Sequence, residues 1–181
     1  MAGRYPEGDF YFFEELLNNE EKAILQKVRD WAQNEVKPIA NDYWERAEFP
    51  FELLPSIKEL NIISLRRGQG YSGLLAGLVT AEIHRADASV GTFFSGQDSL
   101  FTGSIELLGS EQQKNTFLPD LYSVRKTGVF AITEPNAGSD VAKGMTTTAQ
   151  KTDGGWIING EKRWIGNATW SDYVLVFARD I

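Results

Sequence analysis

The sequence predicts an α+β protein in which a helical N-terminal half is followed by a half built of antiparallel strands. Between about residues 18 and 123, apolar side chains recur with the 3.6-residue period of amphipathic helices. From residue 127 onward, short β-favouring runs alternate with turn residues. We therefore expect a helical domain over residues 1–126 and the start of a β domain over residues 127–181.

Composition and charge exclude several classes of function. The chain has 181 residues with 0 Cys and 1 His, which rules out disulfide scaffolds, thiolate chemistry and His-rich centres, so no metal site is expected. The 18 basic and 25 acidic residues give a net charge of −7, which disfavours nucleic-acid binding. No apolar stretch is long enough to span a bilayer, and the first residues match no targeting signal. We expect a soluble cytoplasmic protein, with the mitochondrial matrix and the peroxisome as alternatives.

The first helix is expected to begin after Asn18, because Glu21 follows with the spacing of a capping box. Its apolar face is formed by Ile24, Val28, Trp31 and Ala32. Pro38 is expected to kink or interrupt this helix, and Pro50 to occupy the first turn of the next one.

The glycine-rich segment 66–73 (RRGQGYSG) is interpreted as a loop between helices, because the strand and helix that frame a phosphate-binding loop are missing around it. Residues 74–86 and 89–108 are expected to form two apolar helices. Ser110 and Gln113 supply a second capping box, which predicts a further helix through Leu121.

The strands are expected over short segments of the second half. Residues 128–133 (GVFAIT), which end before a proline, and residues 145–150 with three consecutive threonines have strand composition. Residues 153–155 (DGG) predict a turn, and Asn159-Gly160 predicts a hairpin whose strands are 156–158 and 161–165. With a last strand at 172–178, these segments predict an antiparallel meander. Its uncovered edge at Ile181 indicates the front part of a longer protein.

Loop 133–140 (TEPNAGSD) is the strongest candidate for a binding site in the second half. Its backbone N–H groups can converge on an anion, and Gly138 lets a ligand approach the main chain, although an ordinary polar connection also explains the loop. Glu134 and Asp140 are a candidate carboxylate pair for acid–base chemistry, but their turn positions favour structural roles.

Two further residues have both a functional and a structural interpretation. The Trp164 indole is a candidate wall for a flat-ring ligand, or it packs in the core of the sheet. His84 stands on a helix among Glu82, Arg85 and Asp87, and is expected to be a surface residue in a charge cluster.

Residues 130–140 (FAITEPNAGSD) and 159–167 (NGEKRWIGN) closely resemble the two flavin-site signatures of the acyl-CoA dehydrogenase family. Residues 82–89 (EIHRADAS) and 109–114 (GSEQQK) resemble the stretches that precede the flavin loop in that family. The resemblance covers the chain in order from about residue 19 to residue 181, and is closest to the short-chain acyl-CoA oxidase and glutaryl-CoA dehydrogenase branch.

This resemblance implies a helical N-terminal domain, an incomplete β-barrel-like middle domain, and a C-terminal four-helix domain that is absent from this chain. FAD would lie between the middle and C-terminal domains, with Trp164 packed against the isoalloxazine. Ser139 would serve the pyrophosphate and also touch the acyl-CoA, and segment 95–100 would line part of the acyl pocket. The residues expected to bind FAD are Phe130, Ile132, Thr133, Gly138, Ser139, Trp164, Ile165 and Gly166.

The family's reaction is the FAD-dependent α,β-dehydrogenation of an acyl-CoA thioester to the 2-enoyl-CoA. A carboxylate removes the α-proton while the β-hydrogen leaves as hydride to the flavin. In most branches this base is a glutamate of the C-terminal domain, which would lie beyond Ile181, so no catalytic residue is expected in this chain. An electron-transfer flavoprotein or oxygen would accept the electrons, and the full-length protein would be a homo-oligomer, a dimer or a tetramer.

Two positions depart from the family pattern. Gly166 stands where many of these dehydrogenases carry Thr or Ser, and the run around it resembles the oxidases, which keeps both electron acceptors open. Gly91 stands where glutaryl-CoA dehydrogenases carry the arginine that binds the distal carboxylate. A plain short or medium acyl chain is therefore expected rather than a dicarboxylyl substrate.

Two alternatives belong to other classes of protein. The chain could be a non-catalytic module that binds acyl-CoA or a partner protein through the same surface, or an inactive truncated product. The uncovered sheet edge and the missing flavin wall argue against a stable stand-alone module.

Overall fold

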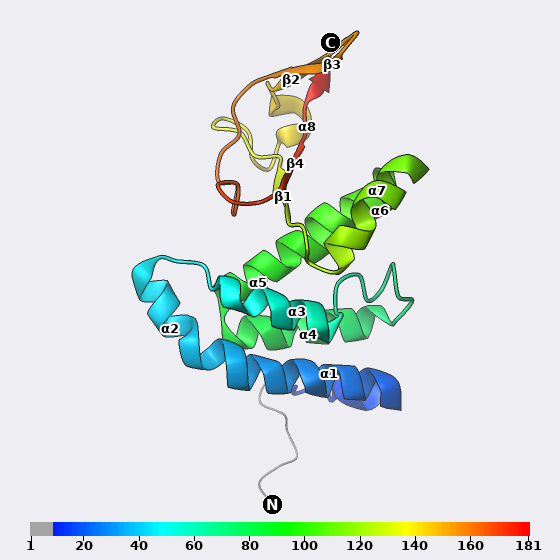
Figure 1. Cartoon of the computed structure of the whole chain (residues 1–181), viewed down its shortest axis with the longest axis vertical. Helices are drawn as coiled ribbons and strands as arrows, with labels where there is room; N and C mark the ends of the chain where they lie inside the picture. Colours follow the sequence, from blue (N-terminus) through cyan, green and yellow to red (C-terminus); the bar gives the residue numbers. More distant parts are fainter. Residues whose placement is uncertain (1–8) are drawn as a thin grey trace, which may run out of the picture.

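The computed structural model describes residues 9–181 and shows a helical part and a small β part that lie end to end (Figure 1). The α-helices are α1 (Asn19–Trp31), α2 (Lys37–Arg46), α3 (Leu54–Leu60), α4 (Gly73–Ala86), α5 (Ala88–Ser95), α6 (Gly103–Leu108), α7 (Glu111–Tyr122) and α8 (Val141–Gly144). The strands are β1 (Gly128–Ala131), β2 (Thr148–Thr152), β3 (Gly155–Asn159), β4 (Tyr173–Val176) and β5 (Arg179–Asp180). Helices followed by a small sheet region confirm the predicted fold class.

Both predicted capping boxes are present. Asn18 Oδ1 accepts from the backbone N–H of Glu21 at 3.0 Å, and a Glu21 carboxylate oxygen accepts from the Asn18 N–H at 3.2 Å. At the start of α7 the same exchange joins Ser110 and Gln113, at 3.2 and 2.8 Å. Each box satisfies N–H groups that have no partner inside the helix, so these two helices begin where the sequence predicts.

Pro38 lies where the first helical stretch bends, as one of the two predicted outcomes has it, but it does not interrupt the stretch. α1 continues through a π-helical segment (Ala32–Val36) into α2, which runs at an angle to α1 and has Pro38 in its first turn (Figure 1). The wider hydrogen-bond spacing of the π segment accommodates the missing proline N–H. Pro50 precedes a 3-10 turn (Phe51–Leu53), and only then does α3 begin.

The hydrophobic core of the helical part lies between α1, α4 and α5. Leu25 and Val28 of α1 and Val79 and Ile83 of α4 are almost completely buried in it. Residues 66–72 form a loop that leads into α4, so the predicted loop is confirmed except that Gly73 already belongs to the helix. Within residues 9–181, no helix combines the length and the apolar character that crossing a membrane requires.

Residues 88–108 are helical throughout, but a π-helical segment (Gly96–Thr102) separates α5 from α6. His84 is only partly a surface residue, because its ring is half-buried against this stretch. A Cβ atom on Gly91 would lie 2.4 Å from the His84 ring, and His84 Nδ1 lies 2.9 Å from the Thr80 carbonyl oxygen. Gly91 is thus required by close packing.

The predicted antiparallel meander is wrong in its strand pairing. β1 pairs with β4 in parallel, with Gly128 opposite Tyr173 and Ala131 opposite Val176. β2 pairs with β3 antiparallel and with β5 in parallel. A long connection separates β1 from β4, and such a connection lets a strand return in the same direction as its partner.

The predicted Asn159-Gly160 hairpin is also wrong, whereas the turn at residues 153–155 is confirmed. The β2–β3 hairpin turns at Asp153-Gly154, a two-residue signal of the same strength. Gly160 has a φ of 153°, and a Cβ atom there would lie 2.4 Å from Thr147 Oγ1. This glycine therefore permits a close approach of two segments, and residues 161–165 do not form a returning strand.

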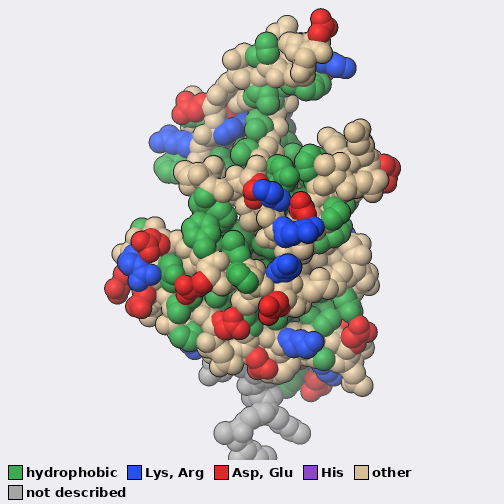
Figure 2. Space-filling model, in the orientation of Figure 1, with side chains coloured by type: hydrophobic (Ala, Val, Ile, Leu, Met, Phe, Trp, Pro, Cys, Tyr) green, Lys and Arg blue, Asp and Glu red, His purple; other side chains and the backbone are tan. Residues whose placement is uncertain are grey.

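Gln97 joins the helical part to the β part. Its side chain is 1% exposed, and its Oε1 accepts from the Gly128 N–H at 2.9 Å. Its Nε2 donates to the carbonyl oxygens of Leu121 at 3.3 Å and Lys126 at 3.2 Å. Through these hydrogen bonds, one residue of the π segment fixes both the end of α7 and the start of β1. Hydrophobic side chains also reach the surface around this junction (Figure 2).

Replacing Gln97 by Leu is expected to lower the free energy of unfolding by about 2–4 kcal/mol, because two buried backbone groups and one partly buried one lose their partner. Urea unfolding followed by circular dichroism measures this change. Gln112→Leu is the matched control, since Gln112 is exposed on α7, and its effect should stay within about 0.5 kcal/mol. Equal stability of the two variants would contradict the role given to Gln97.

Candidate functional site

The two sequence signatures meet just beyond the carboxyl end of β1. The backbone N–H of Arg163 donates to the Thr133 carbonyl oxygen at 2.9 Å. The Lys162 ammonium donates to the Ile132 carbonyl oxygen at 3.0 Å. These bonds hold segment 161–167 alongside the loop that follows β1, so two stretches far apart in the sequence form one surface.

A buried carboxylate holds this surface together. Glu134 accepts from the backbone N–H and the hydroxyl of Thr146, both at 2.6 Å, and from the Thr147 N–H at 2.9 Å. Its remaining partner is the Lys162 ammonium at 2.9 Å, and the two side chains are 2% and 11% exposed. We call Glu134, Thr146, Thr147 and Lys162 the Glu134 clasp.

These donors hold the pKa of Glu134 well below its usual range, the hydrogen bonds from Thr146 and Thr147 contributing most against a smaller opposing effect of desolvation. A carboxylate that stays ionised and has its oxygens occupied is a poor general base. Glu134 therefore has the structural role that the sequence favours. Asp140 is exposed at the start of α8, where its carbonyl oxygen accepts from Lys143 and Gly144.

Trp164 is unusual in both exposure and backbone conformation. Its side chain is 81% exposed, although a tryptophan normally buries most of its surface. Its φ of 62° lies in the left-handed region, which is uncommon for a bulky residue. The Arg163 guanidinium lies 4.6 Å from the centroid of the indole, which leaves the opposite face of the ring for another partner. The alternative in which Trp164 packs in the sheet core is wrong.

The other predicted residues of segment 161–167 flank this indole. Ile165 is partly buried, while Gly166 is exposed. A Cβ atom on Gly166 would meet nothing within 4 Å. The surface beside Trp164 is therefore open, and packing does not require the glycine.

The loop after β1 presents free polar groups near this segment. Gly138 and Ser139 are exposed, and a Cβ atom on Gly138 would also meet nothing within 4 Å. In the part of the chain that the structure describes, the hydroxyls of Thr133 and Ser139 make no hydrogen bond. Unpaired hydroxyls and an open glycine are groups that can receive a polar ligand.

Two predicted residues lie at the edge of this surface. The Phe130 ring packs on Phe177, with centroids 4.7 Å apart, which fixes the end of β1 against the residue that follows β4. Ile132 is half-buried and offers its carbonyl oxygen to Lys162. The predicted acyl-pocket segment 95–100 crosses from α5 into the π segment, where Leu100 is 47% exposed.

Sequence reasoning missed the partners of Glu134. From the sequence alone, the three consecutive threonines predict only a strand, and Lys162 is only one residue of the second signature. Consecutive threonines offer hydroxyl donors in addition to their backbone N–H groups, and such donors can satisfy a buried carboxylate. Nothing in the linear sequence, however, pairs that run with Glu134 in particular.

Family models match most of the chain. The model described as "Acyl-CoA dehydrogenase, N-terminal domain" matches residues 18–125. The model described as "Acyl-CoA dehydrogenase, middle domain" matches residues 129–181 and so contains both signatures.

Curated proteins and solved structures agree with these matches. The acyl-CoA dehydrogenase of Bacillus subtilis is 35% identical over 165 residues, which cover 88% of this chain and 43% of that protein. The mitochondrial short-chain specific acyl-CoA dehydrogenase of Mus musculus is 34% identical over 162 residues, with 87% and 39% covered. A glutaryl-CoA dehydrogenase from Mycobacterium smegmatis in complex with FADH2 superposes with a TM-score of 0.86 at 34% identity, over 92% of this chain and 44% of that chain.

This chain spans less than half the length of these relatives. Even so, the N-terminal family model alone matches more than half of the chain, and the middle-domain model continues almost directly from it. The predicted resemblance is confirmed, and the chain belongs to the acyl-CoA dehydrogenase family.

Proposed function

We propose that the protein containing this chain is an FAD-dependent enzyme that converts an acyl-CoA thioester to the 2-enoyl-CoA. This chain supplies its N-terminal domain (residues 1–126) and the first part of its middle domain (residues 127–181). The observation that carries the proposal is Trp164, an exposed indole in a left-handed backbone that the Glu134 clasp holds beside the loop after β1. The FADH2 in the Mycobacterium smegmatis structure supports it.

The residues on this surface fit a flavin. Trp164 has one ring face covered by Arg163, and its other face is suited to stacking on a flat ring. The unpaired hydroxyl of Ser139 beside the open Gly138 suits a pyrophosphate and an acyl-CoA. The residues that would hold FAD are Phe130, Ile132, Thr133, Gly138, Ser139, Trp164, Ile165 and Gly166. When bound, FAD supplies the acceptor for the hydrogen that leaves the β-carbon as hydride.

The described residues position the reactants, and we infer that the base lies beyond residue 181. Glu134 is excluded from that role because four donors occupy its carboxylate and keep it ionised. Its part is to hold segment 161–167 in place, so that Trp164 stays beside Thr133 without reorganisation during turnover.

The geometry at Gly91 favours a short or medium monocarboxylic acyl group. A Cβ atom there would collide with the His84 ring at 2.4 Å, so a cationic side chain for a distal carboxylate does not fit at this position. The match to the short-chain specific enzyme of Mus musculus agrees with this substrate class. We propose an electron-transfer flavoprotein or oxygen as the electron acceptor and a homo-oligomeric assembly.

Reduction of a bound flavin tests the reaction directly. The protein encoded by the complete gene should show a flavin absorbance band, and anaerobic addition of butyryl-CoA should bleach it. Free butyrate is the control, because it lacks the thioester whose carbonyl must be polarised to acidify the α-proton. A protein that carries no flavin would contradict the proposal.

Trp164→Ala should weaken FAD affinity by about 10- to 100-fold, because one aromatic stacking partner contributes about 1–3 kcal/mol. Equilibrium titration of the apoprotein with FAD, followed by flavin fluorescence, measures this change. Trp44→Ala is the matched control, since Trp44 is also 74% exposed but lies on α2. Similar affinities of the two variants would remove Trp164 from the flavin site.

Glu134→Gln should destabilise the protein at neutral pH, and the destabilisation should shrink in acid. The pKa of Glu134 is lowered by folding, so its ionised form stabilises the fold above the ordinary value of 4.5, and this contribution is lost as the pH falls through the lowered value. Urea unfolding at several pH values should therefore show a constant difference from wild type between about pH 7 and 5 that narrows below about pH 4.

The control for this titration is Glu111→Gln, since the Glu111 side chain is 84% exposed and forms an ion pair with Lys114. Its difference from wild type should be small at every pH. A difference for Glu134→Gln that is independent of pH would show that the charge of Glu134 contributes nothing.

A further inference from the structure

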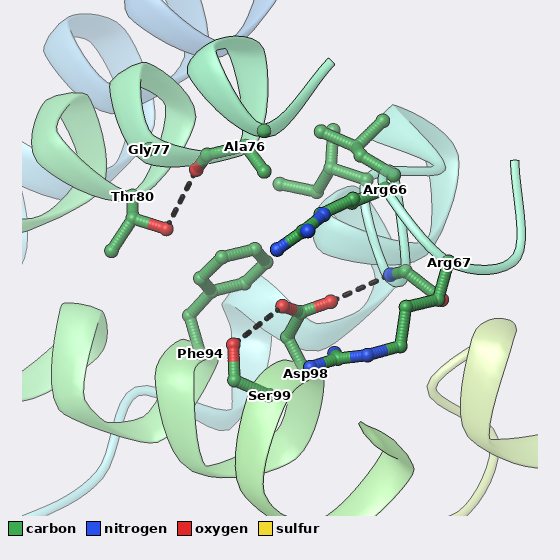
Figure 3. Close-up of a pocket in the computed structure, with 12 residues that line it drawn as sticks. Arg66, Arg67, Ala76, Gly77, Thr80, Phe94, Asp98 and Ser99 are labelled. Carbon is green, nitrogen blue, oxygen red and sulfur yellow. Dashed lines mark hydrogen bonds between the residues drawn. The ribbon is translucent and has the colours of Figure 1, made fainter. Parts of the chain in front are cut away.

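A cavity of about 300 Å³ lies in the helical part, between the loop that precedes α4 and the π segment that follows α5 (Figure 3). Its apolar wall is formed by Ile62, Leu65 and Phe94. Its charged lining residues are Arg66, Arg67 and Asp98. None of the residues proposed to hold FAD lines it, so this cavity requires an explanation of its own.

Two arginines border the cavity without a protein partner. In Figure 3, Arg66 reaches between Phe94 and the helix of Ala76, while Arg67 runs alongside Asp98. Among residues 9–181, neither guanidinium has a carboxylate at ion-pair distance or a hydrogen-bond acceptor. Each guanidinium offers five N–H donors in a planar fork, the arrangement that matches a carboxylate or a phosphate.

Both arginine side chains are exposed, and each lies beside the first residue of a helix. A Cβ atom on Gly73, the first residue of α4, would lie 3.8 Å from Arg66 Nε. A Cβ atom on Gly103, the first residue of α6, would lie 2.9 Å from a terminal nitrogen of Arg67. Arg66 therefore stands at the N-terminal end of a 14-residue helix, whose dipole adds to the positive potential there.

Asp98, the acid that lines the cavity, is already engaged. One of its carboxylate oxygens accepts from the Ser64 N–H at 2.6 Å, and the other accepts from the Ser99 hydroxyl at 2.9 Å. The lining has two positive charges, from Arg66 and Arg67, and one negative charge, from Asp98, so its net charge is positive. The whole chain, by contrast, has a net charge of −7.

We propose that this cavity binds a small organic anion. Arg66 and Arg67 hold its carboxylate or phosphate group, and its apolar part lies on Ile62, Leu65 and Phe94. The volume is at the lower end of the range for small-molecule sites, which suits a single ring or a short chain rather than a nucleotide.

Isothermal titration calorimetry of the protein encoded by the complete gene tests this proposal with three probes of similar shape. Benzoate and phenyl phosphate carry the two anionic groups, and benzyl alcohol is the neutral control. Both anions should bind with one site per chain, and benzyl alcohol at least about tenfold more weakly. The tighter of the two anions identifies carboxylate or phosphate as the preferred group.

Three variants locate the binding. Arg66→Gln/Arg67→Gln should weaken anion binding at least about tenfold. Lys22→Gln/Lys27→Gln removes the same two charges from exposed positions of α1 and should leave binding unchanged. Gly77→Leu fills the cavity, because Gly77 lines it and a Cβ atom there meets nothing within 4 Å. It should abolish binding while keeping or raising the melting temperature, since Leu is the better helix former.

Three results would overturn the proposal. The first is no binding of either anion at about 10 mM, which is weaker than specific recognition provides. The second is unchanged binding in Gly77→Leu, which would place the anion outside the cavity. The third is binding that does not depend on the charges of Arg66 and Arg67, seen as equal weakening in the two double variants or as equal binding of benzyl alcohol.

Discussion

The ion pair between Glu134 and Lys162 is the interaction on which the arrangement of the β part depends. Segment 161–167 contains no strand, so no sheet ladder holds it. The Lys162 ammonium reaches both Glu134 and the Ile132 carbonyl oxygen, and thereby joins this segment to the loop after β1. Thr146 and Thr147 occupy the rest of the carboxylate and add the start of β2 to the same centre. Removing one partner leaves the other buried and uncompensated, which costs more than the pair itself contributes.

The clasp can position Trp164 only because the helical part fixes β1. A Cβ atom on Gly128 would lie 2.1 Å from the Phe101 ring, so the first residue of β1 rests directly on the π segment. Asp172 accepts from the Thr127 N–H at 2.9 Å, which ties the start of β4 to the start of β1. Trp170 packs on Phe49 with ring centroids 4.9 Å apart and adds an apolar contact between the two parts. The helices are therefore the support of the proposed site.

The features predictable from the sequence are those with local causes. The capping boxes at Asn18 and Ser110 and the turn at Asp153 depend on residues close in the chain, and all three are confirmed. The predicted Asn159-Gly160 hairpin is wrong because a glycine after asparagine also occurs where two backbone segments lie very close together. Here Gly160 lies against Thr147, a contact that no local sequence pattern reveals. The parallel pairing of β1 with β4 and the donor groups around Glu134 also join residues far apart in the chain, so no local pattern predicts them. The motif residues could be named from a resemblance, but the clasp that holds them could not.

Backbone conformation separates ordinary strain from strain that requires a functional reason. Ala47 and Asn61 have positive φ because they end helices α2 and α3, where a left-handed residue is common. No helix end explains Ser64 with a φ of 58°, Trp164 with a φ of 62° or Asn167 with a φ of 64°, although asparagine adopts this conformation more readily than the other two. Ser64 lines the arginine-bordered cavity, and Trp164 lies at the meeting point of the two signatures. A local turn accounts for Ser64, because its hydroxyl accepts from the Gly68 N–H at 2.8 Å. Strained backbone that no local structure explains is typical of functional sites. The backbone conformation of Trp164 therefore supports, by an observation independent of the motif, the place to which the flavin is assigned.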